Sequence, residues 1–134
     1  MIKKLLRASV ALITVFSLSM STFAASYVTN DVKTYYGSLA SYQYSKTSKK
    51  FTSETGKNST GNVYEITVGL SVLNYKTGST IDEDFARKYN TRKASVDCYA
   101  SYGTVNDVSV YGSHSAYNNG KCTFFAYTDA IYAM

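Results

Sequence analysis

Proline and tryptophan are absent from the 134 residues, histidine occurs once and cysteine twice. A structural zinc site needs four Cys or His side chains, and the chain has fewer than that in all. The sequence also lacks a Gly-x-Ser-x-Gly elbow, a phosphate-binding loop and a dinucleotide-binding fingerprint. We therefore expect no metal, no cofactor and no enzymatic activity of those classes.

Tyrosine and small polar residues dominate instead. There are 14 tyrosines, and Ser, Thr, Asn and Gly are frequent after residue 25. Such a composition favours β-sheet and turns over helices. Apolar residues make up 45% of the chain, which is enough for a core, and the length suits a single domain.

The first 25 residues have the layout of a secretory signal peptide. Basic residues precede an apolar run from Ala8 to Leu18, and small residues follow. A transmembrane anchor needs about 20 apolar residues, and this run is too short. We expect cleavage within residues 24–26, after Ala24 or Ser26. The product, residues 26–134, would be a single secreted, extracellular β-domain without a transmembrane anchor.

Removing the leader lowers the net charge from +5 to +2, because Lys3, Lys4 and Arg7 leave with it while all nine acidic residues stay. The remaining basic residues are too sparse to form a phosphate-binding stripe, and they do not alternate with aromatic residues. Nucleic acid is therefore not an expected partner.

Cys98 and Cys122 remain in the exported part. An even number of cysteines outside the cell predicts a disulfide. On the chain-entropy model, closing a loop of about 25 residues would stabilise the fold by about 3.5 kcal/mol. A catalytic thiol is the weaker interpretation, because His114 is the only possible base.

Apolar and polar residues alternate in four segments, Asn62–Tyr75, Lys93–Ser101, Asp107–Tyr111 and Cys122–Tyr127, which predicts half-buried strands. The residues expected to face the core are Tyr64, Ile66, Val68, Leu70, Val72, Ala94, Val96, Cys98, Ala100, Val108, Val110, Cys122, Phe124 and Ala126. Residues 32–45 are expected to be extended and residues 51–55 to add a short edge strand. The fold prediction is all-β: a small antiparallel β-sandwich, or a barrel, of about six strands. The sandwich is favoured because each strand has one apolar face.

The segment from Tyr117 to Lys121 reads Tyr-Asn-Asn-Gly-Lys and predicts a hairpin. A two-residue loop of Asn119 and Gly120 would pair Tyr117 with Cys122 and split the core between two faces. A three-residue loop with a left-handed Gly120 pairs Tyr117 with Lys121 and aligns the apolar faces. We predict the three-residue loop.

The segment Thr80–Lys88 is the one helical candidate. Thr80 and Glu83 have capping-box spacing, acidic residues come early and basic residues come late. At most one short helix is expected here, and an acidic loop is the alternative.

His114 lies between Ser113 and Ser115, a pattern that could pair a nucleophile with a base. On a strand, however, both serines point to the face opposite the imidazole. We expect instead a half-buried histidine opposite Phe124. Asp82, Glu83 and Asp84 are adjacent in the sequence, which does not favour the flanking carboxylate pair of a glycosidase. The protein is predicted not to be an enzyme.

Aromatic residues gather on the face turned away from the core. In the predicted register Tyr111 faces Tyr127, while Tyr117, Phe125 and Tyr99 extend the group. Rings interleaved with hydroxyls form a surface that loses little conformational entropy on binding. We predict these five residues as a binding face. The alternative is that the rings only stabilise the sheet through cross-strand pairs.

Three functions from different classes fit these features. The first is a secreted non-catalytic β-sandwich that binds a cell-envelope glycan or protein through the tyrosine-rich face, although the absence of tryptophan counts against a carbohydrate module. The second is an exported antibacterial or toxin-like peptide, as in bacteriocins, which the size, leader and mild positive charge permit. The third is a self-assembling extracellular matrix protein, because long proline-free strands are prone to edge pairing.

Overall fold

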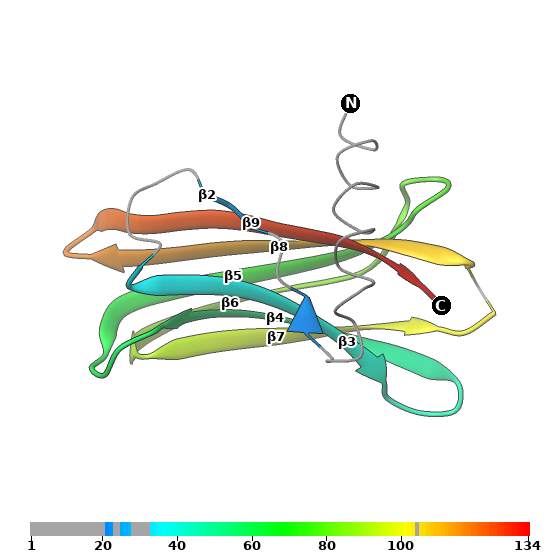
Figure 1. Ribbon diagram of the computed structural model, residues 1–134, viewed down its shortest axis with the longest axis horizontal. Helices are drawn as coiled ribbons and strands as arrows, with labels where there is room; N and C mark the ends of the chain where they lie inside the picture. The colour runs from blue at the N-terminus through cyan, green and yellow to red at the C-terminus, as the bar shows by residue number, and fades with distance from the viewer. Residues whose placement is uncertain (1–20, 23–24, 28–32, 104) are drawn as a thin grey trace.

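The protein is all-β in a computed structural model that describes residues 21–22, 25–27, 33–103 and 105–134 (Figure 1). Residues 1–20 and 23–24 of the predicted signal peptide lie outside the described residues, and among those described no helix could cross a membrane. The long strands are β3 (Tyr35–Gln43), β4 (Ser48–Lys57), β5 (Val63–Asn74), β6 (Thr80–Thr91), β7 (Lys93–Ser101), β8 (Asp107–Asn118) and β9 (Lys121–Ala133). Two short strands, β1 (Ser21–Thr22) and β2 (Ala25–Tyr27), precede them.

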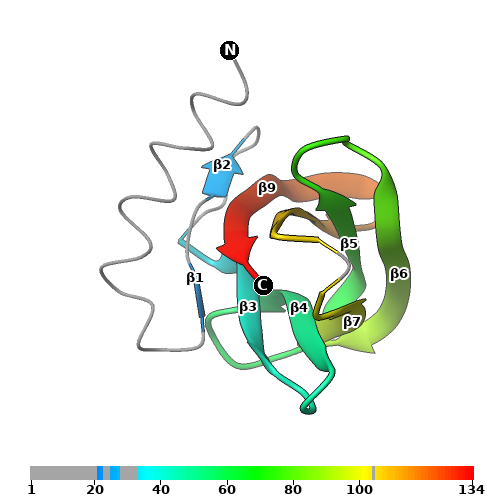
Figure 2. The same cartoon turned by 90° about the vertical axis from the view of Figure 1, so that its right-hand side faces the viewer.

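The strands form two antiparallel sheets that pack face to face, which confirms the predicted β-sandwich. Sheet A has the order β1-β3-β4-β7, and sheet B has the order β2-β9-β8-β5-β6. The end view in Figure 2 places β3, β4 and β7 opposite β9, β5 and β6. Each sheet therefore has one inner face, which lines the core, and one outer face.

The core lies between the inner faces, and the alternation read from the sequence identifies most of it. Its largest fully buried apolar side chains are Phe51, Phe124, Leu39, Ile66, Val63, Val68, Val72, Val108 and Val110. Two predicted core residues, Tyr64 and Cys122, are exposed instead. At Tyr64 the strand alternation changes phase, since Val63 takes the buried position, and Asn90 on the neighbouring strand has a positive φ of 50°.

One segment of sheet A differs in role from the prediction. Residues 32–45 contain β3, as expected. Residues 51–55, expected as a short edge strand, belong to the ten-residue β4 in the middle of the sheet, between β3 and β7. Ser53 and Thr55 are buried on β4 although they are polar, so the hydropathy pattern does not identify this segment as a central, buried strand.

The segment Thr80–Lys88 is neither a helix nor a loop, because it lies within β6. It pairs with β5 over its length, with Glu83 opposite Ser71 and Arg87 opposite Thr67. Sheet hydrogen bonds thus outweigh local capping signals that stabilise a helix only modestly. The charged residues also suit an edge strand, where they oppose pairing with other chains.

The β8–β9 hairpin has the two-residue turn, so the predicted three-residue loop is wrong. Asn119 and Gly120 have φ angles of 52° and 73°, as a type I′ turn requires, and Tyr117 pairs with Cys122. A bulge then shifts the register so that Ala116 pairs with Phe124, and Thr123 is the extra residue. The bulge restores the alignment of the two apolar faces that the shorter turn alone would have broken.

The predicted disulfide is not formed. Cys98 is buried on sheet A, with its Sγ 3.8 Å from the backbone oxygen of Leu70, whereas Cys122 is exposed on β9 of sheet B. Leu70 pairs with Gly112, which lies five residues along β8 from Tyr117, the partner of Cys122. Five residues of strand at about 3.3 Å each place Gly112, near Cys98, about 16 Å from Tyr117, the partner of Cys122. A disulfide needs Cα atoms within about 7 Å of each other.

Only one of the two thiols should therefore react in the native protein. Burial raises the pKa of Cys98 to about 12, and its sulfur has no access to solvent, whereas Cys122 is open to reagents. We expect a thiol-specific reagent to label one cysteine in native protein and both in denaturant. A denatured, unreduced sample with no reactive thiol would instead support the disulfide.

Candidate functional site

Four of the five predicted binding residues, Tyr111, Tyr117, Phe125 and Tyr127, lie together on the outer face of sheet B, on β8 and β9. Tyr99 does not join them, because β7 belongs to sheet A and its exposed side faces the other way. Strand alternation assigned each ring to an outer face but could not assign the sheet.

The bulge changes which residues are neighbours on this face. Tyr127 lies opposite Ser113 and not opposite Tyr111 as predicted. On its other side, Ser113 pairs with Gly69 of β5, and Gly69 in turn pairs with Phe85 of β6. The row Phe85–Gly69–Ser113–Tyr127 thus has an aromatic ring at each end and small residues between them.

A groove of about 630 Å³ runs over these small residues. Gly69 keeps its floor low, because a Cβ there would come within 2.4 Å of the Ser113 Oγ. Phe85 and Tyr127 stand at the sides with 57% and 49% of their surface exposed. Phe125 packs edge-on against Tyr127, with ring centroids 4.9 Å apart, and so supports that ring.

Phe85 is the functional residue that the sequence analysis missed. The sequence predicts a helix or an acidic loop for its segment, and neither places a ring beside Tyr127. The residues around Phe85 do not alternate with a period of two, so the sequence offered no strand signal here. Recognising Phe85 required the knowledge that this segment is a strand.

The groove is acidic at one end. The next row of the sheet contains Glu83, Ser71, Tyr111 and Asp129, and the first three line the groove. Asp84 pairs with the buried Leu70, so its side chain lies on the opposite face of β6. Asp129 is half-buried, and burial raises the pKa of its carboxyl group.

Arg87 lies on the same face, two residues beyond Phe85. Its Nε is 3.1 Å from the Oε1 of Glu65, so this cation is neutralised by its own ion pair. It therefore adds little positive charge to the groove.

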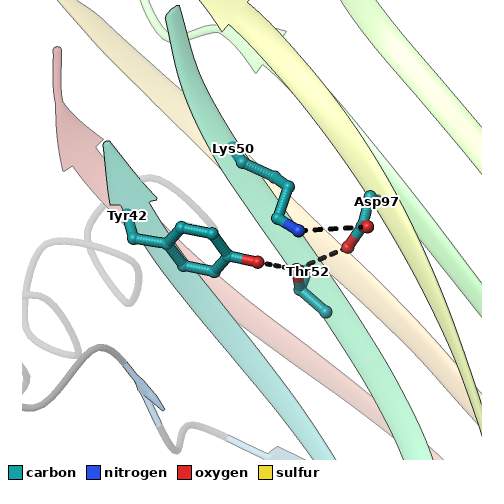
Figure 3. A network of polar contacts seen from close by, with 4 residues as sticks. All are labelled: Tyr42, Lys50, Thr52 and Asp97. Carbon is teal, nitrogen blue, oxygen red and sulfur yellow. Dashed lines mark hydrogen bonds and ion pairs between the residues drawn. The ribbon is translucent and has the colours of Figure 1, made fainter. Parts of the chain in front are cut away.

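The outer face of sheet A is different, because its polar groups bind one another (Figure 3). Asp97 accepts a 2.6 Å hydrogen bond from Thr52 and lies 3.3 Å from the Nζ of Lys50, which in turn lies 4.7 Å from the centre of the Tyr42 ring. Tyr99 packs edge-on against Tyr44 at 5.0 Å. These polar groups and rings already contact one another on the outer face of sheet A. The outer face of sheet B is therefore the better candidate for a binding surface.

His114 is part of the core rather than of a catalytic pair. It is fully buried, not half-buried, and it pairs with Ala126 instead of Phe124. Its ring nitrogens lie 2.8 Å from the Thr55 hydroxyl and 2.7 Å from the Thr128 hydroxyl. Burial lowers its pKa to about 4, so the imidazole is neutral at pH 7. As expected from strand alternation, Ser113 points to the opposite face, into the groove.

Comparison with protein-family models gave no match, and a search of curated proteins also gave none. The chemistry of the groove is thus the basis on which a function can be assigned.

Proposed function

We propose that the protein is a secreted, non-catalytic binding module that holds a cell-envelope glycan in the groove of sheet B. The observation that carries this proposal is the row Phe85–Gly69–Ser113–Tyr127, in which two exposed rings flank a floor of small residues. Strands lie about 4.8 Å apart, so the outer two of these four strands are about 14 Å apart. A sugar ring fits between aromatic side chains at such a separation.

The groups around the groove match the two surfaces of a sugar. Phe85 and Tyr127 offer apolar ring faces on which the C–H face of a sugar can stack. Ser71, Ser113 and the hydroxyl of Tyr111 can exchange hydrogen bonds with sugar hydroxyl groups. Because these rings are smaller than tryptophan, each contact is expected to be weak, which suits a repetitive polymer bound at several sites.

Removing both flanking rings should abolish most of the binding. Stacking contacts contribute about 0.5–1.5 kcal/mol each, so the double variant Phe85→Ala/Tyr127→Ala should lose about 1–3 kcal/mol of binding free energy and bind about 5- to 150-fold more weakly. The measurement is co-sedimentation of mature protein with insoluble peptidoglycan and cell-wall polysaccharides, quantified over a range of protein concentrations.

The matched control is Tyr44→Ala/Tyr99→Ala, which removes two exposed rings from the outer face of sheet A. It should retain wild-type binding. Equal losses in both double variants, or no retention of the wild-type protein on any envelope polymer, would count against a glycan site on sheet B.

A further inference from the structure

We propose that the protein forms a dimer in which β9 pairs, antiparallel, with β9 of a second copy of the chain. The pairing uses the β9 edge, meaning the side of β9 that faces away from β8, and it joins sheet B of the two copies into one continuous sheet. The proposal goes beyond glycan binding, because it rests on the order and protection of the strands and not on the groove.

The β9 edge is long and has little protection against strand addition. β9 has 13 residues and lies at the side of sheet B opposite to β6 (Figure 2). In the described part of the chain β2 is the one strand on this edge, and it covers Ala126–Thr128. From Cys122 to Ala133 the sequence contains no proline and a single charged residue, Asp129. Proline and charged side chains are the features that keep exposed edges from pairing with other chains.

The strands on the far side of the sandwich, β6 and β7, are protected. On β6 the carboxylates of Asp82 and Asp84 accept hydrogen bonds from the backbone N–H groups of Glu83 and Phe85, at 3.0 and 2.8 Å. Asp82 also accepts a 2.9 Å hydrogen bond from the backbone N–H of Tyr99 on β7. Backbone donors that a further strand would need are thus already occupied, so strand addition is favoured at the β9 edge instead.

The short strand β2 shows that an antiparallel strand fits on the β9 edge, since Ser26 lies opposite Tyr127. β2 contributes three pairs of residues, and it lies at the predicted cleavage site. Cleavage within residues 24–26 would leave β2 as the extreme N-terminus of the mature chain, where so short a segment frays. A full-length β9 from a second copy offers a longer ladder of hydrogen bonds and can displace it.

The outer side chains of β9 match those of a second β9 that runs in the opposite direction. With the twofold axis at Ala126, Phe125 lies opposite the partner's Tyr127, and Tyr127 lies opposite the partner's Phe125. Within one chain these two rings already pack edge-on, with centroids 4.9 Å apart, so the dimer would combine two such pairs into one aromatic cluster. An axis at Tyr127 would instead place Phe125 opposite the carboxylate of the partner's Asp129. The same surface is used twice, so the contact closes as a dimer and does not propagate into a fibre.

The first experiment measures the assembly of the unmodified mature protein and uses Cys122 as a natural labelling site. Sedimentation in the presence of a reductant should show a monomer–dimer equilibrium. Cys122 is exposed and lies four residues from Ala126, so a spin label on each copy should give a separation of about 26 Å by pulsed EPR. A monomer at all concentrations, or a label separation below about 15 Å or above about 40 Å, would overturn the proposal.

Charge variants test the register. Phe125→Lys/Tyr127→Lys places like charges opposite each other across the twofold axis, whereas Phe125→Glu/Tyr127→Lys removes the same rings and places opposite charges there. We expect the first variant to dimerise at least about tenfold more weakly than the second. Equal dimerisation of the two variants would contradict pairing about Ala126. Circular dichroism shows whether each variant is folded.

The control is Phe85→Lys/Tyr89→Lys, which replaces two exposed rings on β6 and should dimerise like the wild type. Loss of the dimer in this variant would place the contact at β6 and overturn the proposal. All of these measurements are made without glycan, so a failure of the dimer leaves the proposed function in place, and a failure of glycan binding leaves the dimer in place.

Discussion

Substituting Gly37 by alanine is expected to lower the free energy of unfolding by about 1–3 kcal/mol, in the range measured for overpacked cores. A Cβ at Gly37 would lie 2.4 Å from the Cδ2 and 2.5 Å from the Cγ of His114, which faces it across the sandwich. The imidazole cannot withdraw easily, since Thr55 and Thr128 hold it from both sides. Moving it would leave buried polar groups without partners, which adds to the steric cost. Urea denaturation of wild type and variant provides the measurement.

Gly69→Ala is the matched control. A Cβ at Gly69 would come just as close to a neighbouring atom, at 2.4 Å, but that atom is the Oγ of Ser113 on the outer face. A serine hydroxyl can rotate away, so the expected change is within about 0.5 kcal/mol. If both variants lost the same stability, the close approach of β3 to His114 would not be the cause.

Lowering the pH from about 6.5 to about 4 should cost the protein roughly 3 kcal/mol of stability through His114 alone. Burial lowers the pKa of this imidazole to about 4 in the folded state, whereas in the unfolded chain it stays near its ordinary value. The unfolded state therefore binds a proton first as the pH falls, and acid favours unfolding. The effect is absent above pH 6.5 and complete below pH 4. Asp129 acts in the opposite direction, because its raised pKa lets the folded state take up a proton more readily.

His114→Gln separates this contribution from the general effect of acid on carboxylates. Glutamine keeps hydrogen-bonding groups between Thr55 and Thr128 but does not titrate. We expect the variant to be less stable at pH 7 and to have a shallower dependence of the unfolding free energy on pH between 6.5 and 4. Because the chain has one histidine, its imidazole resonance can also be followed directly by NMR. An imidazole that titrates near pH 6.5 in the folded protein would contradict the burial described here.

Several parts of the fold followed from local pattern. The period of two in β5 and β7 identified strands and their buried faces, because each strand has one side against the core and one against solvent. The same reasoning assigned Tyr111 and Tyr127 to an outer face.

Other features depended on partners that are distant in sequence. β6 has the local signals of a helix and becomes a strand only because β5 offers it an edge to pair with. The sheet to which Tyr99 belongs, and the bulge that sets the neighbours of Tyr127, follow from how the strands associate.

The sequence by itself therefore determined an all-β chain, its strongest strands and the rings available for an outer surface, because side-chain alternation is a local property. Only the tertiary structure decided that Cys98 and Cys122 lie apart, that Phe85 joins Tyr127 across a groove, and that Glu83 borders it. Those juxtapositions arise from strand order and register, which depend on the packing of whole sheets and leave no signature in any single segment.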